Sequence, residues 1–384
     1  MRGTWQFALV LAGLFFSPMA CAFSAAAEDE SDLDWDPETT RVFIVGLLEW
    51  ERADIWNSFP DCKPNRRDQQ LADYFREAGV PADQLVYLQD AEATKSHIQK
   101  EFVKFLEDSE EGELLVFYFC GHGFRDRKTD ETWFANYDAG DENDSAWSVL
   151  SIYAAIEKHF SGNRALLLAD CCHSGALYDL AQKHRDSDIA YAVLTSSYSH
   201  NSSTGNWTFS DSVLAGLNGE AAVDLNGDEV VDLSEIATYA ELELAFIEGQ
   251  KSMFSADNRF PRKAVLADVE DSVEARVGQR VEVDFDGKWY KAKTVDTDGP
   301  QLEVHYVNFP DSADEWVTPE RIRPYQPAQF AAGDKVTVRW DTDGKWYPAT
   351  VIRGWYGLHF VHYDDDSSLN DEWVGPGAIQ LRSE

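Results

Sequence analysis

Apolar residues in the first two thirds of the chain form two kinds of pattern. Residues 114–120 and 166–169 are unbroken apolar runs of strand length, which is typical of strands covered on both faces of a parallel sheet. Residues 68–78 and 93–106 instead carry apolar side chains at helical spacing, with one face turned to a core. Strands that alternate with helices predict an α/β fold with a mostly parallel sheet flanked by helices.

The same reasoning gives the remaining elements of this region. A polar loop is expected over residues 124–147. We predict strands at residues 41–48, 84–88, 114–120, 166–170, 190–195 and 263–267. We predict helices at residues 68–78, 93–106, 149–160, 209–217 and 233–248.

The last third of the chain contains two copies of one pattern. Gly-Lys-Trp-Tyr, His-Tyr and Asp-Glu-Trp-Val each occur twice, and all three pairs are separated by 57 residues. Short alternating strands, such as 279–285 and 335–340, predict two small all-β barrels at residues 276–324 and 331–382.

The N-terminal residues 1–22 have the features of a secretory signal peptide. Arg2 is positively charged, residues 7–16 form a short apolar core, and Ala-Cys-Ala at 20–22 offers a cleavage site between small residues. The apolar core is too short to span a bilayer, and no later segment could do so. We therefore expect export to the periplasm or the extracellular space without a membrane span. A lipoprotein signal acylated at Cys21 is an alternative that the preceding residues fit poorly.

The composition is strongly acidic. The chain has 69 Asp and Glu against 33 Lys and Arg, a formal charge of −36. Such a surface repels phosphate backbones, so we expect no nucleic-acid partner, whereas cationic partners would be attracted. Residues 23–40 are rich in Ala, Asp and Glu, and we expect them to be a flexible acidic segment.

A histidine and a cysteine directly follow two of the buried runs. Gly121-His122-Gly123 comes after the first run, and Cys172 comes after the second. Because reacting groups in parallel sheets gather at the carboxyl ends of the strands, both side chains are expected at one edge. This arrangement, with the histidine fifty residues upstream, suits a cysteine nucleophile with a histidine base. The alternative is a core histidine and buried thiols, but two flanking glycines open His122 to solvent.

The two stretches Tyr-Phe-Cys-Gly-His-Gly (118–123) and Asp-Cys-Cys-His-Ser-Gly (170–175) together resemble the metacaspases and their bacterial caspase-like relatives. The resemblance covers residues 41–268 and implies a caspase-like peptidase domain, with residues 263–267 as its closing edge strand. It also implies that Cys172 is the nucleophile and that the neighbouring Cys171 is structural. In that family the dyad needs no third member.

The resemblance further implies residues that surround the reaction. The main-chain N–H groups of Gly123 and Cys172 would form the oxyanion hole. Asp68 and Asp170 match acidic positions that bind an arginine or lysine side chain before the cut bond, and two anions favour such a cation. Cys120 lies where the family often has serine, which would alter the pocket floor. For both acids a structural role is the alternative, for Asp68 as a charge at a helix N-terminus.

Residues 224–235 have the ligand spacing of an EF-hand calcium loop, although Glu229 replaces the usual glycine. The alternative is an acidic turn that caps the following helix. No cofactor is needed for the chemistry, so calcium would be an addition. The candidate calcium ligands are Asp224, Asn226, Asp228, Val230, Asp232 and Glu235.

The repeated C-terminal pattern resembles the Tudor and agenet group of SH3-like barrels. In that group aromatic side chains form a cage for a cationic ligand through cation–π attraction. The alternative is that these aromatic residues pack the barrel cores. The candidate cage residues are Trp289, Tyr290, Tyr306, Phe309 and Trp316 in the first copy, and Trp346, Tyr347, Tyr363 and Trp373 in the second.

Together these features predict an exported cysteine endopeptidase that cleaves proteins or peptides after Arg or Lys, with Tudor-like modules that bind substrate or a partner. The alternative is a non-catalytic adaptor that keeps a caspase-like scaffold and acts through its barrels.

Overall fold

The structure is a computed structural model, in which six parts of the chain are described. The signal peptide predicted at residues 1–22 and most of the acidic segment at 23–40 lie outside them. The described residues are 35–126, 128–269, 277–340, 343–364, 366 and 370–382.

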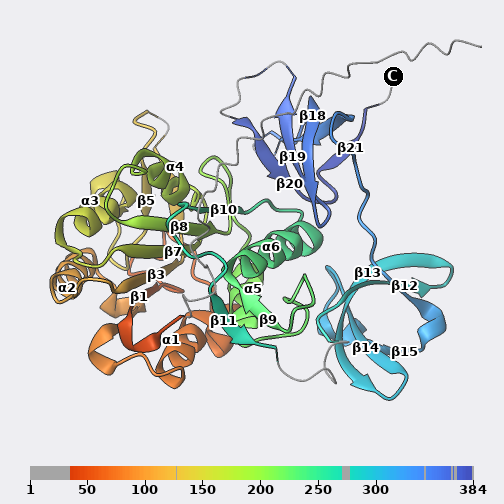
Figure 1. Cartoon of the computed structure of the whole chain (residues 1–384), viewed down its shortest axis with the longest axis horizontal. Helices are drawn as coiled ribbons and strands as arrows, with labels where there is room; N and C mark the ends of the chain where they lie inside the picture. Colours follow the sequence, from red (N-terminus) through yellow and green to blue (C-terminus); the bar gives the residue numbers. More distant parts are fainter. Residues whose placement is uncertain are drawn as a thin grey trace, which may run out of the picture.

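A six-stranded sheet forms the centre of the first domain (Figure 1). Five strands are parallel, and only the edge strand β10 runs antiparallel to its neighbour. In spatial order the strands are β10 (Met253–Ala256), β8 (Ala190–Thr195), β7 (Arg164–Asp170), β3 (Leu114–Cys120), β1 (Thr40–Gly46) and β2 (Leu85–Gln89).

Helices cover both faces of this sheet, as the alternating pattern predicted. Neighbouring residues of one strand point to opposite faces, so Phe117 and Phe119 enter one core while Val116 and Tyr118 enter the other. The first core holds α2 (Lys95–Glu107), α3 (Val149–His159) and α4 (Ala176–Lys183), and the second holds α1 (Arg67–Glu77), α5 (Thr208–Leu217) and α6 (Leu233–Glu243).

Two sequence expectations for this domain are wrong. The segment 263–267 does not close the sheet, because β11 (Val265–Asp268) pairs with β9 (Val230–Asp232) in a separate ribbon. The edge is instead β10, whose four half-buried residues carry too little apolar pattern to signal a strand. The polar loop expected at 124–147 contains a small sheet of β4 (Gly123–Arg125), β5 (Thr132–Phe134) and β6 (Trp147–Ser148).

The last third of the chain forms two small five-stranded antiparallel sheets with the same strand order (Figure 1). Their alternating residues are buried, and this fits the period of the sequence. The first barrel contains β12 (Arg280–Phe285), β13 (Lys288–Asp298), β14 (Gln301–Tyr306), β15 (Glu315–Val317) and β16 (Ile322–Pro324). The second contains β17 (Lys335–Arg339), β18 (Trp346–Trp355), β19 (Leu358–Tyr363), β20 (Glu372–Val374) and β21 (Ile379–Leu381).

Both barrels contact the first domain. In the first barrel, Lys293 lies 2.6 Å from Glu243 at the end of α6. In the second, Lys251 of the first domain forms a buried ion pair with Glu372. None of the helices in the described ranges has both the length and the apolar character needed to cross a membrane.

Candidate active site

Strands β3 and β7 are neighbours, and they place His122 and Cys172 at the same sheet edge. The parallel register aligns Cys120 with Asp170, so each candidate catalytic residue lies two positions beyond an aligned pair. The two following loops are in close contact, since a methyl group built on Gly123 would lie 2.0 Å from the Cys172 carbonyl oxygen. The glycine after the histidine is therefore required by the approach of the nucleophile's own peptide.

The half-buried His122 ring is held by a main-chain carbonyl rather than by a carboxylate. Its Nε2 lies 2.7 Å from the carbonyl oxygen of Asn57, which can only accept. The rings of Trp50 and Phe59 pack within 4.5 Å and 4.8 Å of the imidazole centroid. Burial lowers the pKa of His122, and the hydrogen bond to Asn57 opposes this in part. The neutral tautomer thus carries its proton on Nε2 and leaves Nδ1 as the base.

Cys172 is half-buried, and its sulfur faces the loop that follows β8. The main-chain nitrogen of Ser203 lies 3.3 Å from Sγ. An N–H group directed at sulfur favours the thiolate over the thiol. The neighbouring Cys171 is buried, and burial raises the pKa of its thiol well above the ordinary value, so it is unreactive.

The backbone around the nucleophile is shaped by the same loop. His173 has a φ of 60°, a conformation that costs a non-glycine residue energy. Its main-chain nitrogen donates to the Asn201 carbonyl at 2.8 Å, which holds this conformation. A side chain on Gly175 would lie 2.4 Å from the Ser199 nitrogen, so the glycine of the motif makes room for the loop.

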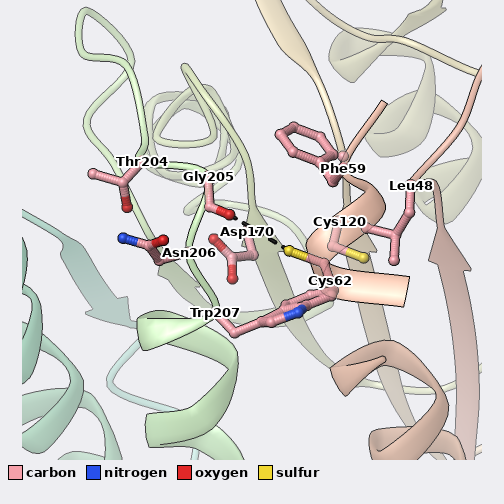
Figure 2. Close-up of a pocket in the computed structure, with 10 residues that line it drawn as sticks. Leu48, Phe59, Cys62, Cys120, Asp170, Thr204, Gly205, Asn206 and Trp207 are labelled. Carbon is pink, nitrogen blue, oxygen red and sulfur yellow. Dashed lines mark hydrogen bonds between the residues drawn. The ribbon is translucent and has the colours of Figure 1, made fainter. Parts of the chain in front are cut away.

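A pocket opens beside the dyad, between the 3-10 turn at Pro60–Asn65 and residues 204–207 (Figure 2). Its volume is about 30 Å³, which is room for roughly two or three water molecules. An arginine side chain therefore requires the walls to move apart. The lining residues are Leu48, Phe59, Cys62, Cys120, Gly121, Asp170, Thr204, Gly205, Asn206 and Trp207.

Asp170 supplies the acid of this pocket (Figure 2). Burial raises its pKa to about 6, while hydrogen bonds from Ser210 and Ser196 oppose the shift. The Ser210 hydroxyl donates to one carboxylate oxygen at 2.6 Å. The carboxylate is therefore largely ionised at neutral pH but loses its charge in mild acid.

Asp68, the second acid expected there, is fully buried and is not among the residues that line the pocket in the described structure. Arg66 pairs with it at 2.7 Å, and the Tyr87 hydroxyl donates to it at 2.8 Å. Arg66 also pairs with Asp90 at 2.7 Å. These contacts give Asp68 a structural partner of opposite charge close to the pocket.

The candidate calcium loop brings three carboxylates together. Ligand oxygens of Asp224, Asp228 and Glu235 all lie within 4.8 Å of one another, so these residues fit a hard cation. Asp232 instead accepts from the Glu235 main-chain nitrogen and caps α6 in a capping box. Glu229 has a φ of 68° in the position usually held by glycine.

Each barrel carries one aromatic pocket, and each contains only part of the predicted cage. In the first barrel the pocket is lined by Phe285, Tyr290, Tyr306, Phe309, Ala313 and Glu315. In the second it is lined by Trp340, Tyr347, Pro348, Tyr363 and Asp366. The remaining candidates lie outside both linings: Trp289, Trp316, Trp346 and Trp373.

The peptidase half of this architecture has a known counterpart. Residues 79–181 match the family model described as the metacaspase, peptidase C14 domain. The matched segment contains both His122 and Cys172, and it supports a cysteine peptidase family for this domain. The comparison with curated proteins gave no match.

Three solved structures show partial likeness. A protein, GSU0716, from Geobacter sulfurreducens has 14% identity and a TM-score of 0.43 over 60% of this chain and 100% of its own. The tandem Agenet domain 3-4 of ADCP1 has 24% identity and a TM-score of 0.13, covering 28% of this chain and 80% of its own. Agenet domains 3-4 of Arabidopsis thaliana AGDP1 have 25% identity and a TM-score of 0.13, covering 28% and 82%.

Proposed function

We propose that this protein is an exported cysteine endopeptidase that cleaves after Arg or Lys with a His122–Cys172 dyad. The observation that carries the proposal is the contact between the two loops at the carboxyl edge of β3 and β7, where Gly123 lies against Cys172. Buried Asp170, at the bottom of the adjoining pocket, offers a carboxylate to a basic side chain. A peptidase domain acts on proteins or peptides, which makes these the substrate class.

In the proposed reaction, Nδ1 of His122 takes the thiol proton of Cys172, and the sulfur attacks the carbonyl carbon of the scissile peptide. The N–H groups of Gly123 and Cys172 donate to the oxyanion. His122 then gives its proton to the leaving amine, the C–N bond breaks, and a thioester remains. Water hydrolyses this thioester with His122 again acting as the base.

We propose in addition that the loop at 224–235 binds Ca²⁺. The convergence of Asp224, Asp228 and Glu235 supports this site. The charge of a bound cation would relieve the repulsion among the three carboxylates and hold the turn that precedes α6. Isothermal titration with CaCl₂ tests the site: binding to the wild type and none to Glu235→Gln is expected, and equal heats from both proteins contradict it.

For the barrels we propose a cationic ligand, bound by aromatic faces and a nearby carboxylate. The open pockets at Tyr290 with Glu315, and at Tyr347 with Asp366, support this chemistry. Such a ligand could be a basic segment of the substrate, which the acidic surface would also attract.

Fluorogenic peptides test the peptidase directly. Full-length protein in a reducing buffer is offered Arg, Lys and Asp peptides with and without calcium. Cys172→Ala should lose more than about a thousandfold in turnover, whereas Cys171→Ala, the adjacent thiol, should stay active. Turnover in neither protein would favour the non-catalytic adaptor, and preference for the Asp peptide would contradict the assigned pocket.

A further inference from the structure

The second barrel grips the loop that faces the nucleophile. Loop 196–206 connects β8 to α5, and two of its side chains reach the barrel. The Tyr198 hydroxyl accepts from the main-chain nitrogen of Trp373 at 3.2 Å. The His200 ring stacks on Trp340 with a centroid distance of 4.5 Å and an interplanar angle of 5°.

The opposite side of loop 196–206 surrounds Cys172. Ser203 directs its main-chain nitrogen at the sulfur, and Asn201 and Ser199 hold both the backbone and the ring of His173. Residues 204–206 form one wall of the pocket beside Asp170. Any displacement of this loop therefore changes both the surroundings of the sulfur and the width of the pocket.

A second connection joins the barrel to the same loop through the segment before β10. The Gln250 amide accepts from the Thr204 nitrogen at 2.8 Å and donates to the Ser203 hydroxyl at 3.1 Å. The next residue, Lys251, pairs with Glu372 of the barrel at 2.5 Å, and both side chains are 2% exposed. A buried pair of this kind tolerates little displacement, because separating the charges leaves each without its partner.

Comparison of the two barrels shows that this connection is particular to the second. In the first barrel the Tyr306 hydroxyl donates to Glu315, and Glu315 pairs with Arg321 of the same barrel at 2.7 Å. In the second barrel Tyr363 donates to Glu372 in the same way. Ala378 stands 57 residues after Arg321, at its place in the repeat, and Lys251 from the peptidase domain supplies the cation.

The aromatic pocket of the second barrel shares residues with both connections. Trp340 lines this pocket and stacks on His200, while Tyr363 lines it and bonds to the Glu372 that pairs with Lys251. A group bound in the pocket would thus touch two side chains that also touch the peptidase domain. Coupling between sites needs such a shared element whose position both sites bias.

We propose that the second barrel controls the reactivity of Cys172. Its contacts with Tyr198, His200 and Lys251 position loop 196–206, and a cationic group in the pocket of Trp340, Tyr347 and Tyr363 shifts that position. The ligand class rests on the proposed function, whereas the control of Cys172 does not require that any peptide is cleaved. Tyr198 and His200 are positioning residues, since they act on the sulfur through the loop.

Alkylation of Cys172 by iodoacetamide is the readout, followed by mass spectrometry of the peptide that carries it. The full-length double variant Tyr198→Phe/His200→Ala should react roughly two- to thirtyfold more slowly at pH 7, and its half-maximal rate should move to higher pH, because Ser203 no longer favours the thiolate. Phe309→Ala, in the pocket of the first barrel, is the matched control and should behave as wild type. An unchanged rate and pH profile in a double variant that still unfolds cooperatively overturns the proposal.

The pocket is tested with a peptide that contains one trimethyllysine. The wild-type alkylation rate should change in a saturable manner as this peptide is added, and Phe309→Ala should respond equally. Tyr347→Ala, whose ring is 38% exposed in the pocket, should not respond. A wild-type rate that stays constant up to millimolar peptide overturns the pocket as the control site. If alkylation responds while no fluorogenic peptide is cleaved, the peptidase proposal fails and the coupling stands.

Discussion

His122 donates its Nε2 proton to the main-chain carbonyl of Asn57 across 2.7 Å, so that a backbone oxygen takes the place of an orienting carboxylate. A neutral acceptor fixes the tautomer without adding a negative charge that would raise the pKa of the ring. Burial among aromatic rings lowers that pKa instead. The imidazole consequently stays neutral, and able to accept a proton, below the pH at which a solvent-exposed histidine would be protonated.

The pH dependence of substrate binding should follow Asp170. Its pKa is raised to about 6, so the carboxylate that would hold an arginine side chain is present above pH 6 and lost below it. We expect KM for an Arg peptide to fall as pH rises from 5 to 7. Asp170→Asn should lose this dependence and roughly ten- to a hundredfold in kcat/KM for Arg peptides. Asp61→Asn, an exposed acid near the same pocket, is the control, and a similar loss there would contradict the assignment.

Gly123 should tolerate no side chain. The Cβ of Gly123→Ala would lie 2.0 Å from the Cys172 carbonyl oxygen, so the histidine and cysteine loops must separate. Misplacement of about 1 Å can cost about a hundredfold in rate, and we expect a loss of that order in kcat/KM. Gly140→Ala has its nearest neighbour at 3.7 Å and should remain active. Wild-type turnover by Gly123→Ala would show that the loops need not approach.

The buried pair of Arg66 and Asp68 should contribute to stability. Asp68→Asn removes one of the two carboxylates around Arg66, and breaking a buried ion pair costs on the order of 3 kcal/mol in the free energy of unfolding. Asp73→Asn breaks the exposed pair with Arg76 and should cost less than about 1 kcal/mol. Urea unfolding of both variants measures the difference. Equal midpoints would mean that Asp68 is not a structural acid.

Stability should depend on pH through Glu241. Burial, assisted by the charge of Glu372, raises the pKa of Glu241 to about 8. The unfolded chain ionises this group near pH 4.5 and the folded chain only near pH 8, so the wild type loses free energy of unfolding as pH rises between these values. Glu241→Gln removes the effect and should gain stability relative to wild type from pH 5 to 8, with no further gain above. Thermal unfolding across this range checks the slope, and parallel curves would exclude Glu241 as its source.

The sequence predicted the parts of the fold that depend on local pattern. Continuous apolar runs placed β3 and β7, and the residues that follow them placed His122 and Cys172 at one sheet edge. Asn57 could not be foreseen, because a main-chain carbonyl leaves no trace in residue identity. The pairing of Arg66 with Asp68 depends on side-chain directions at the start of α1, which helical periodicity does not specify.

The choice of cage tryptophans shows a second limit of pattern reasoning. Trp346 and Tyr347 are consecutive in a strand, so they point to opposite faces and only one can enter the pocket. Strand register aligns Phe285 with Trp340 at a separation of 55 residues, because the second hairpin is two residues longer. A constant separation of 57 residues therefore conceals Trp340.

The lysine that pairs with Glu372 makes the two repeats unequal as building blocks. The first barrel contains its own arginine partner for Glu315 and could be excised or transplanted with that pair intact. The second barrel borrows its cation from the enzyme-like domain, so cutting it away would strand a buried acid. After duplication, one copy has thus kept its portability, whereas the other has become a dependent part of the scaffold to which it is fused.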